Sequence, residues 1–412
     1  MDIEATTARD GSAIVTIDGT PQKITATTLE DARAQVVAIA QERATTAGES
    51  VTLTASDPDG VWTVIVTPDG SLHDPAEAAV AGTHAQAHTP PRAAGSPIAH
   101  LLSRREVQGR HSFLTVSQAE QPATQGWRGV ATRLGLRMNP SPHERAERAD
   151  THAVSQHWPG PRTIVVANGK GGAGKTPTTV LLSAVFARHG GAGVVSWDAN
   201  QTRGTLGWRT EQGPHNATIL DLLPQAERLL GTSAQSADLA HYVHHQTADR
   251  FDVLRSQPIQ LAADQRVTPH DVDLIWHVVG KYYRMIIIDT GNDESDPVWL
   301  KAVEHADQIV VPTTTRADHA EAGALLLDAL RARDERSRRL ADNAVAVVTQ
   351  ADPRATKTDI TNIVTGYAEL ARDVITIPHD PAIVDGILHW DALRPTTQRA
   401  WLRAAAAVAQ GL

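Results

Sequence analysis

The nonapeptide Asn168-Gly169-Lys170-Gly171-Gly172-Ala173-Gly174-Lys175-Thr176 sets the class of fold for this chain. It fits the pattern G-x-x-x-x-G-K-[ST], in which glycines allow backbone N–H groups to curl around phosphate oxygens. The apolar run 163–167 before it predicts a strand, and the segment after it, up to Ala187, predicts a helix. This order is typical of a phosphate-binding loop. The residues expected to hold phosphate are Gly169, Gly171, Gly172, Ala173, Gly174, Lys175 and Thr176.

Strand and helix patterns alternate through the rest of the C-terminal half. The predicted strands lack polar–apolar alternation, which is typical of a parallel sheet covered by helices on both faces. Such sheets bind ligands at the carboxyl ends of their strands. We therefore expect residues 161–412 to form a doubly wound, mostly parallel α/β domain. Its other strands are predicted at 193–197, 251–255, 285–289, 308–311, 344–348 and 374–377, with helices at 271–280 and 317–334 among those between them.

Two side chains of the loop carry the expected chemistry. Lys175 is placed to reach the β- and γ-phosphates of a nucleotide, and the Thr176 hydroxyl is placed to bind Mg²⁺. ATP and Mg²⁺ are therefore the predicted cofactors. Lys170 adds a second lysine to the same loop, in a chain whose 38 basic residues include few other lysines.

With Lys170, the loop resembles the deviant phosphate loop K-G-G-x-G-K-T of the ParA/MinD family of P-loop ATPases. The resemblance implies that Lys170 reaches the phosphates of a second subunit, so that the ATP-bound state is a homodimer. The segment Ser196-Trp197-Asp198-Ala199-Asn200-Gln201 resembles the family motif D-x-D-P-Q. By this resemblance, Asp198 orients the attacking water.

Three later segments extend the resemblance over about 160–400. The strand Met285-Ile286-Ile287-Ile288-Asp289 resembles the Walker B strand, so Asp289 is expected to hold Mg²⁺ together with Thr176. The run Gln308-Ile309-Val310-Val311-Pro312 resembles the next family strand. The segment Ile377-Pro378-His379-Asp380 resembles the loop that flanks adenine, which makes Pro378 and Asp380 candidate nucleotide ligands.

Two positions depart from the family pattern. Ser196 stands in place of the first aspartate of D-x-D-P-Q, and Pro177 stands in place of a second threonine that helps to hold the α-phosphate. Proline has no N–H to donate. Thr178 could substitute, or nucleotide affinity could be weaker. We therefore expect an ATPase with slow turnover.

Residues 1–75 are expected to form a small α+β domain of unknown role, with the order β-α-β-β. Its predicted strands are 13–17, 50–55 and 61–66, its helix is 28–43, and the turn Asp57-Pro58-Asp59-Gly60 predicts a hairpin.

Residues 76–160 have the composition of a flexible linker rich in Arg, Pro and Ala. Trp127, Val130 and Leu134 are spaced as on a short amphipathic helix within 126–136. One interpretation is a tether whose helix docks on the ATPase domain. The other is a peptide-like segment that contacts a partner, DNA or lipid.

Composition restricts the class of protein. The 412 residues carry a formal net charge of -9, so contact with nucleic acid would need a local basic patch. The absence of cysteine suits a reducing compartment. No apolar run approaches the roughly 20 residues of a membrane span, and the polar N-terminus does not resemble a signal peptide. These features favour a cytoplasmic protein without an integral membrane segment.

Several further clusters admit a structural and a functional interpretation. We expect His241, His244 and His245 to lie on a surface helix and not to bind metal, and helix 398–410 to pack on the sheet. The acidic run 292–296 is expected to be a switch loop that senses the γ-phosphate. The arginines either bind DNA phosphates or belong to an ordinary surface; they are Arg331, Arg333, Arg336, Arg338, Arg339, Arg394, Arg399 and Arg403.

Three functions follow from these expectations. The first is plasmid or chromosome partition by an ATPase dimer that binds DNA nonspecifically and positions a cargo through an adaptor. The second is an ATPase associated with type VII secretion or cell polarity, whose N-terminal domain binds a protein partner. The N-terminal extension resembles that of actinobacterial family members with either role. The third is a slow or inactive nucleotide-gated scaffold, suggested by Pro177 and Ser196.

Overall fold

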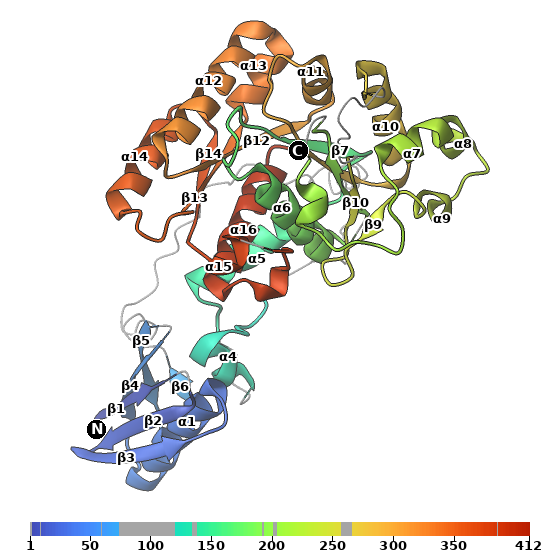
Figure 1. Ribbon diagram of the computed structural model, residues 1–412. Coiled ribbons are helices and arrows are strands. Elements are labelled where there is room, and N and C mark those ends of the chain that lie inside the picture. Colours follow the sequence, from blue (N-terminus) through green and yellow to red (C-terminus); the bar gives the residue numbers. More distant parts are fainter. Residues whose placement is uncertain are drawn as a thin grey trace, which may run out of the picture. The chain divides into compact units, whose positions relative to one another are not determined.

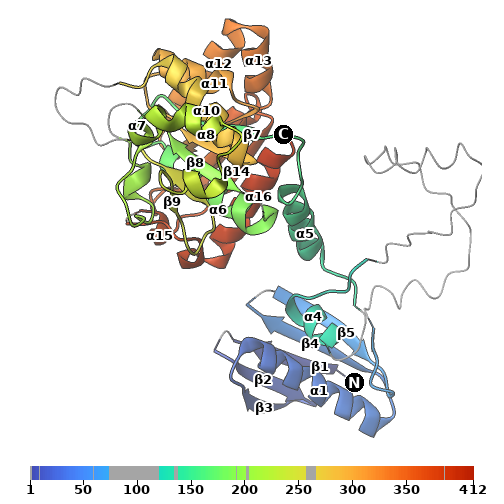
Figure 2. The same cartoon turned by 90° about the vertical axis from the view of Figure 1, so that its right-hand side faces the viewer.

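The computed structural model of the protein describes two compact units, Met1–Arg145 and Ala146–Leu412 (Figures 1 and 2). The described residues are 2–8, 10–58, 60–73, 120–133, 138–191, 193–200, 204–256, 266–384 and 386–412. Most of the predicted linker, including Leu134 of the predicted helical stripe, therefore lies outside them.

A six-stranded sheet of order β3-β2-β1-β4-β5-β6 forms the body of the N-terminal unit. Alternate residues of its strands, such as Ile3, Val15 and Leu53, are buried against helix α1 (Leu29–Ala47). Thr28 caps this helix, because its hydroxyl accepts a hydrogen bond from the N–H of Asp31. The strands are β1 (Asp2–Thr7), β2 (Ser12–Ile17), β3 (Thr20–Thr25), β4 (Val51–Asp57), β5 (Gly60–Val66) and β6 (Leu72–His73).

The expected order β-α-β-β was incomplete. Strand β1 lies at the centre of the sheet, antiparallel to β2 and parallel to β4. Its sequence DIEATT buries only the small set Ile3, Ala5 and Thr7, which gives a weak apolar signal. Strand β3 buries Ile24 alone, as suits an edge strand. Pairing with neighbours, which the local sequence does not record, stabilises both strands.

Helix α4 (Gly126–Arg133) packs within the N-terminal unit, so the expectation that it docks on the ATPase domain was wrong. Ala131 is fully buried among the residues that cover the sheet, and Trp127 packs against the same cluster. Arg133 forms an ion pair of 2.6 Å with Glu30 of α1. The helix thus completes the core of the first unit.

An eight-stranded sheet of order β14-β13-β12-β7-β11-β8-β10-β9 forms the second unit. All its paired strands are parallel except the edge strand β9, which confirms the predicted doubly wound, mostly parallel α/β fold. The strands are β7 (Arg162–Val166), β8 (Val194–Asp198), β9 (His244–His245), β10 (Asp252–Leu254), β11 (Met285–Asp289), β12 (Gln308–Thr314), β13 (Val345–Thr349) and β14 (Asp373–Ile377).

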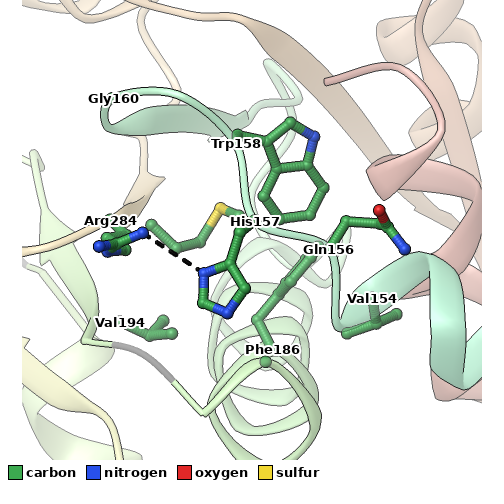
Figure 3. A pocket seen from close by; sticks show the side chains of 10 residues that line it. Val154, Gln156, His157, Trp158, Gly160, Phe186, Val194 and Arg284 are labelled. Carbon is green, nitrogen blue, oxygen red and sulfur yellow. Dashed lines mark hydrogen bonds between the residues drawn. The ribbon is translucent and has the colours of Figure 1, made fainter. Parts of the chain in front are cut away.

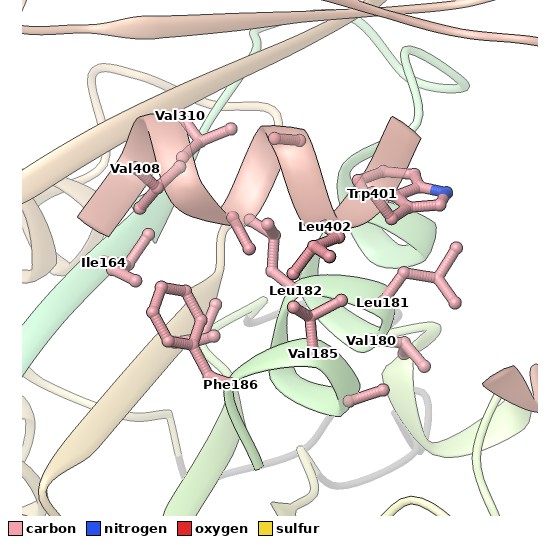
Figure 4. Packing of buried hydrophobic residues seen from close by; sticks show 14 of the residues in the cluster. Ile164, Val180, Leu181, Leu182, Val185, Phe186, Val310, Trp401, Leu402 and Val408 are labelled. Carbon is pink, nitrogen blue, oxygen red and sulfur yellow. The ribbon is translucent and has the colours of Figure 1, made fainter. Parts of the chain in front are cut away.

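Helices cover both faces of this sheet. On one face, α6 (Lys175–Gly190) packs against α16 (Pro395–Ala409), with Leu182, Trp401 and Leu402 in one apolar cluster (Figure 4). This confirms that the last helix packs on the sheet. The other face carries α10 (Pro269–Tyr282), α11 (Pro297–Glu304), α12 (Ala317–Arg333) and α13 (Glu335–Asp342). The remaining helical segments are α7 (Ile219–Leu222), α8 (Ala226–Leu230), α9 (Ser236–Leu239), α14 (Lys357–Ala368), α15 (Pro381–Val384) and the short 3₁₀ turns η1 (Leu206–Trp208), η2 (Leu223–Gln225) and η3 (Trp390–Ala392).

Two local expectations were not met. Helix α5 (Pro142–Val154) lies within the range for which the sequence predicted a linker with a single short helix. Its buried Asp150 forms ion pairs with Arg399 and Arg403 of α16. His244 lies on the short strand β9 and not on a surface helix. It is fully buried, and its ring nitrogens bond to backbone groups of Gly213 and Ala217.

Candidate nucleotide-binding site

The phosphate loop joins the end of β7 to the start of α6. Gly172 and Gly174 have φ values of 82° and 96°, which side chains other than glycine rarely adopt. Asn168 holds the loop in place. Its amide nitrogen donates to the carbonyls of Pro312 and His319 at 2.8 and 3.1 Å, and its amide oxygen accepts from the N–H of Lys170. Contacts within the protein thus hold the shape of the loop.

Lys175 lies buried at the centre of the loop. Its ammonium donates to the backbone carbonyls of Asn168 and Lys170 at 2.8 and 3.2 Å, and to the side-chain oxygen of Asn292 at 2.5 Å. Burial lowers the pKa of this ammonium, whereas the charges of Asp289 and Glu294 raise it. All three acceptors are neutral, so the site offers a buried cation to an anionic ligand.

Thr176 and Asp289 meet next to Lys175. The Thr176 hydroxyl donates to Oδ2 of Asp289 at 2.7 Å and lies 2.8 Å from the hydroxyl of Thr205. Among the described residues, the buried Oδ1 of Asp289 has no hydrogen-bond partner. Burial raises the pKa of Asp289, because its charged form is poorly solvated there. A hydroxyl beside an unsatisfied buried carboxylate oxygen fits the preference of Mg²⁺ for oxygen ligands.

Asp198 ends strand β8, directly beside Asp289 in the sheet register. Its Oδ2 accepts from the Ser256 hydroxyl at 3.0 Å and from the N–H of Leu206 at 3.3 Å. Burial and then the charge of Asp289 raise its pKa. A side chain at Gly204 would place its Cβ only 1.9 Å from Oδ2, so the following backbone closes over this carboxylate.

The acidic loop after β11 lies against the phosphate loop. Besides the contact of Asn292 with Lys175, a Cβ added at Gly169 would lie 2.5 Å from Oε1 of Glu294. Burial raises the pKa of Glu294, whereas a backbone hydrogen bond from Gly169 and the charge of Lys175 lower it. The sequence indicated a switch loop here but not which of its residues touch the phosphate site.

Part of the phosphate loop, Asp289 and Asn292 line one cavity of about 560 Å³. The loop and metal-site residues lie at one end, represented by Lys175 and Asp289. Lining residues elsewhere in the cavity include Trp208, Arg209, Thr349, Gln350, Ala351, His379, Asp380, Ile383 and Val384. The cavity therefore lies at the carboxyl ends of β7, β11, β13 and β14, as expected for this class of sheet.

Some of the predicted site residues line this cavity and others do not. Gly171, Gly172, Gly174, Lys175, Thr176, Asp289 and Asp380 line the cavity, whereas Gly169, Lys170, Ala173, Asp198 and Pro378 are not among its lining residues.

Lys170 and Asp380, both predicted to bind nucleotide, have different surroundings. The Lys170 side chain is about half exposed and lies 3.7 Å from Asp318. The Asp380 carboxylate accepts from the N–H groups of Ala382 and Arg394. Sequence reasoning missed Thr205, Trp208 and the segment 349–351, which carry no motif.

The two departures from the family pattern have different consequences. The hydroxyl of Ser196 lies in the core, 2.6 Å from that of Ser183, away from the cavity. Pro177 does line the cavity. Thr178 is buried and is not among the lining residues.

A second, much smaller cavity lies beside Trp158 and Phe186 (Figure 3). Its volume of about 20 Å³ has room for a single water molecule. His157 and Arg284 are joined across it by a hydrogen bond of 3.3 Å. It is therefore a packing gap. In the described ranges, no group of three His, Asp or Glu side chains is arranged to hold a metal ion.

None of the helices in the described part of the chain combines the length and the apolar character needed to cross a bilayer.

Comparison with known proteins identifies relatives of this chain. Two curated relatives are the ESX-1 secretion-associated protein EspI of Mycobacterium tuberculosis, from strains CDC 1551 / Oshkosh and H37Rv. Each is 27% identical over 296 residues, which covers 69% of this chain and 42% of the relative. The chain thus spans less than half the length of these relatives.

Solved structures with similarity to this chain include a ParA family ATPase and a septum site-determining protein. A ParA family ATPase from Chlorobium tepidum is 19% identical, with a TM-score of 0.43, over 61% of this chain and 95% of its own. MinD from Pyrococcus horikoshii, complexed with Mg-ADP, is 18% identical, with a TM-score of 0.44, over 60% and 94%.

A family match supports the motif evidence directly. Residues 161–340 match the family described as "AAA domain", and this range contains the phosphate loop, Asp198 and Asp289. The matched range and the site geometry agree with the motif K-G-G-x-G-K-T. Through its second unit, the chain matches this family model and carries the phosphate-loop motif of the ParA/MinD P-loop ATPases.

Proposed function

We propose that this protein is a Mg²⁺-dependent ATPase that forms a homodimer around bound ATP. One observation carries the proposal: a buried ammonium, whose acceptors among the described residues are neutral, lies next to a buried carboxylate oxygen that has no hydrogen-bond partner among those residues. A nucleotide phosphate and Mg²⁺ would satisfy both groups. Bound MgATP would supply a polarised γ-phosphoryl group for attack by water.

The residues have distinct roles in this proposal. Lys175 and the loop N–H groups bind the phosphates, and Thr176 with Asp289 holds the Mg²⁺. Asp198 orients the attacking water. Lys170, with its exposed side chain, acts on the phosphates of the second subunit.

For the cellular role, we favour an ATPase associated with protein secretion over DNA partition. The named relative is a secretion-associated protein, and its similarity covers 69% of this chain. Most of the arginines considered for DNA binding have internal partners. Arg331 contacts Asp342, Arg333 contacts Glu304, Arg338 and Arg339 contact Glu335, and Arg399 and Arg403 contact Asp150.

The N-terminal unit would then be the part that binds a protein partner, as an adaptor or cargo site. Its sheet carries α1 on one face, while polar residues such as Glu4, Thr52 and Thr54 alternate with the buried ones. A compact unit with its own core suits recognition of another protein better than a tether does.

The experiment that tests the ATPase proposal is replacement of Lys175 by alanine. We expect Lys175→Ala to abolish nucleotide binding or turnover, because it removes the buried cation from the phosphate loop. Binding is measured with a fluorescent ATP analogue and turnover by phosphate release. Lys357→Ala, which removes an exposed lysine at the start of α14, is the matched control. Wild-type binding and turnover in the Lys175→Ala protein would refute the proposal.

A further inference from the structure

The cavity wall carries an exposed tryptophan. Trp208 is 64% exposed, although large apolar side chains are usually covered by the protein. It follows Gly207 in the 3₁₀ turn η1 and lines the same cavity as Lys175. An exposed indole in the wall of a ligand cavity offers a flat apolar surface to the ligand.

The backbone beneath Trp208 is firmly held. Leu206 is fully buried, and its N–H donates to Asp198. The N–H of Trp208 donates to the carbonyl of Thr205 at 3.0 Å. Thr205 in turn contacts the hydroxyl of Thr176 in the predicted metal site. The turn is thus attached directly to the groups that would bind Mg²⁺ and water.

Two arginines next to η1 hold this turn in place. Arg209 donates to the carbonyls of Ile383 and Val384 at 2.6 and 3.3 Å, which ties η1 to α15 across the cavity. Arg255 donates to the carbonyl of Glu211 at 2.8 Å and packs under the turn. A Cβ at Gly207 would lie 3.1 Å from Cδ of Arg255, so glycine permits this close packing. The indole is therefore exposed but mounted on a rigid support.

The cavity combines the two surfaces that a nucleotide needs. Its loop end carries the buried Lys175 ammonium and suits phosphate. Trp208, Ile383 and Val384 add apolar surface to its wall, and Val384 is itself 52% exposed. A ligand with an anionic chain and a planar ring would satisfy both.

We propose that Trp208 is a stacking platform for the adenine base of the bound nucleotide, a role that rests on the ATPase function proposed above. Stacking on an aromatic side chain accepts the flat face of any base. Because the support is already rigid, little ordering is needed when the base binds. Trp208 thus contributes affinity from the nucleoside end of the ligand, independently of the phosphate loop.

The test compares ADP with pyrophosphate by isothermal titration calorimetry, in Mg²⁺, on the full chain. ADP is used because it separates base binding from the ATP-dependent dimer. We expect Trp208→Ala to weaken ADP binding about tenfold or more and to leave pyrophosphate binding within about twofold. Trp208→Phe, which keeps a ring, should restore ADP binding to within about threefold. Ile387→Ala removes another exposed apolar side chain outside the cavity and should leave both ligands unchanged.

Each other outcome has a definite meaning. Equal losses for ADP and pyrophosphate in Trp208→Ala would overturn the proposal, because the phosphate end would then depend on the indole. Unchanged ADP binding with loss of ATP-dependent dimers would also overturn it and assign the indole to the subunit interface. If the wild-type protein bound neither ligand, the ATPase proposal itself would fail first.

Discussion

Glu294 places a carboxylate against the phosphate loop. Its Oε1 lies close to Gly169, and its neighbour Asn292 holds Lys175. A negative charge at this position repels the phosphates of an incoming nucleotide. We expect Glu294→Gln to bind ATP about threefold to tenfold more tightly at pH 8, a change of about 0.7–1.4 kcal/mol.

The same contact gives a pH dependence of known sign. Burial raises the pKa of Glu294 above its usual value of 4.5. Above the raised pKa the carboxylate is charged and opposes binding; as the pH falls through it, the wild type loses that charge. The affinity difference between wild type and Glu294→Gln should therefore be largest at pH 8 and shrink towards pH 5.

Titration of both proteins with a fluorescent ATP analogue at several pH values measures this difference. Asp293→Asn is the control, because Asp293 is exposed and its carboxylate is held by Ser295. An equal gain of affinity in Asp293→Asn would mean that general charge, and not the contact of Glu294, controls binding.

Residues of the site were predictable to different degrees. Lys175 and Thr176 belong to one short motif, and Asp289 ends an apolar strand, so local sequence was sufficient to identify them. The acidic run 292–296 was expected at the site because it follows Asp289, but its sequence does not show that Glu294 is the residue beside Gly169. Trp208 has no such signal, because its place in the cavity wall depends on a tertiary contact.

At the scale of elements, an ion-pair cluster joins α5 to α16. Asp150 is buried and contacts Arg399 at 2.7 Å and Arg403 at 3.2 Å. Asp150→Ala would leave the mostly buried Arg399 without this partner. We expect a loss of about 2 kcal/mol in the free energy of unfolding of the second unit, as for a broken buried pair that retains some solvent access.

Urea denaturation followed by tryptophan fluorescence measures this loss, since Trp401 lies buried in α16. The matched control is Asp373→Ala, because Asp373 approaches Arg403 only to 4.0 Å and is more exposed. That control should lose no more than about 0.5 kcal/mol. Equal losses in the two variants would show that Asp150 has no special part in holding α5.

Strands were predictable from the sequence where helices cover both faces of the sheet, because such strands are strongly apolar. Strand β11 with the sequence MIIID and strand β13 with VAVVT are examples. Helix α5 has the polar sequence PHERAERADTHAV, and charged contacts such as Asp150–Arg399 help to anchor it. An ion pair between residues so distant in sequence leaves no periodic signal, so the local sequence does not predict α5.

At the scale of the whole molecule, the net charge of -9 and the internal arginine pairs oppose a DNA track. Nonspecific DNA binding depends on neutralisation of phosphates by accessible basic side chains and falls steeply with salt. We expect no ATP-dependent binding to random-sequence duplex DNA in fluorescence anisotropy with ATP and with ADP across a salt series. Lys175→Ala is the control. Tight, ATP-dependent and salt-sensitive binding would restore DNA partition as the leading function.

The assembly that ATP is proposed to induce depends on Lys170. Its side chain is exposed and lies 3.7 Å from Asp318, a pair that contributes little to stability. Lys170→Ala should therefore leave the fold and the binding of ATP within about threefold of wild type. It should abolish the ATP-dependent dimer, because in that dimer Lys170 of one subunit is proposed to contact the phosphates of the ATP bound to the other subunit.

Light scattering with ATP, with ADP and without nucleotide measures the mass of the protein in each state. Lys301→Ala, a lysine on α11 paired with Asp273, should still dimerise. A Lys170→Ala protein that dimerises with ATP as the wild type does would remove Lys170 from the interface and leave the phosphate-site assignment of Lys175 intact.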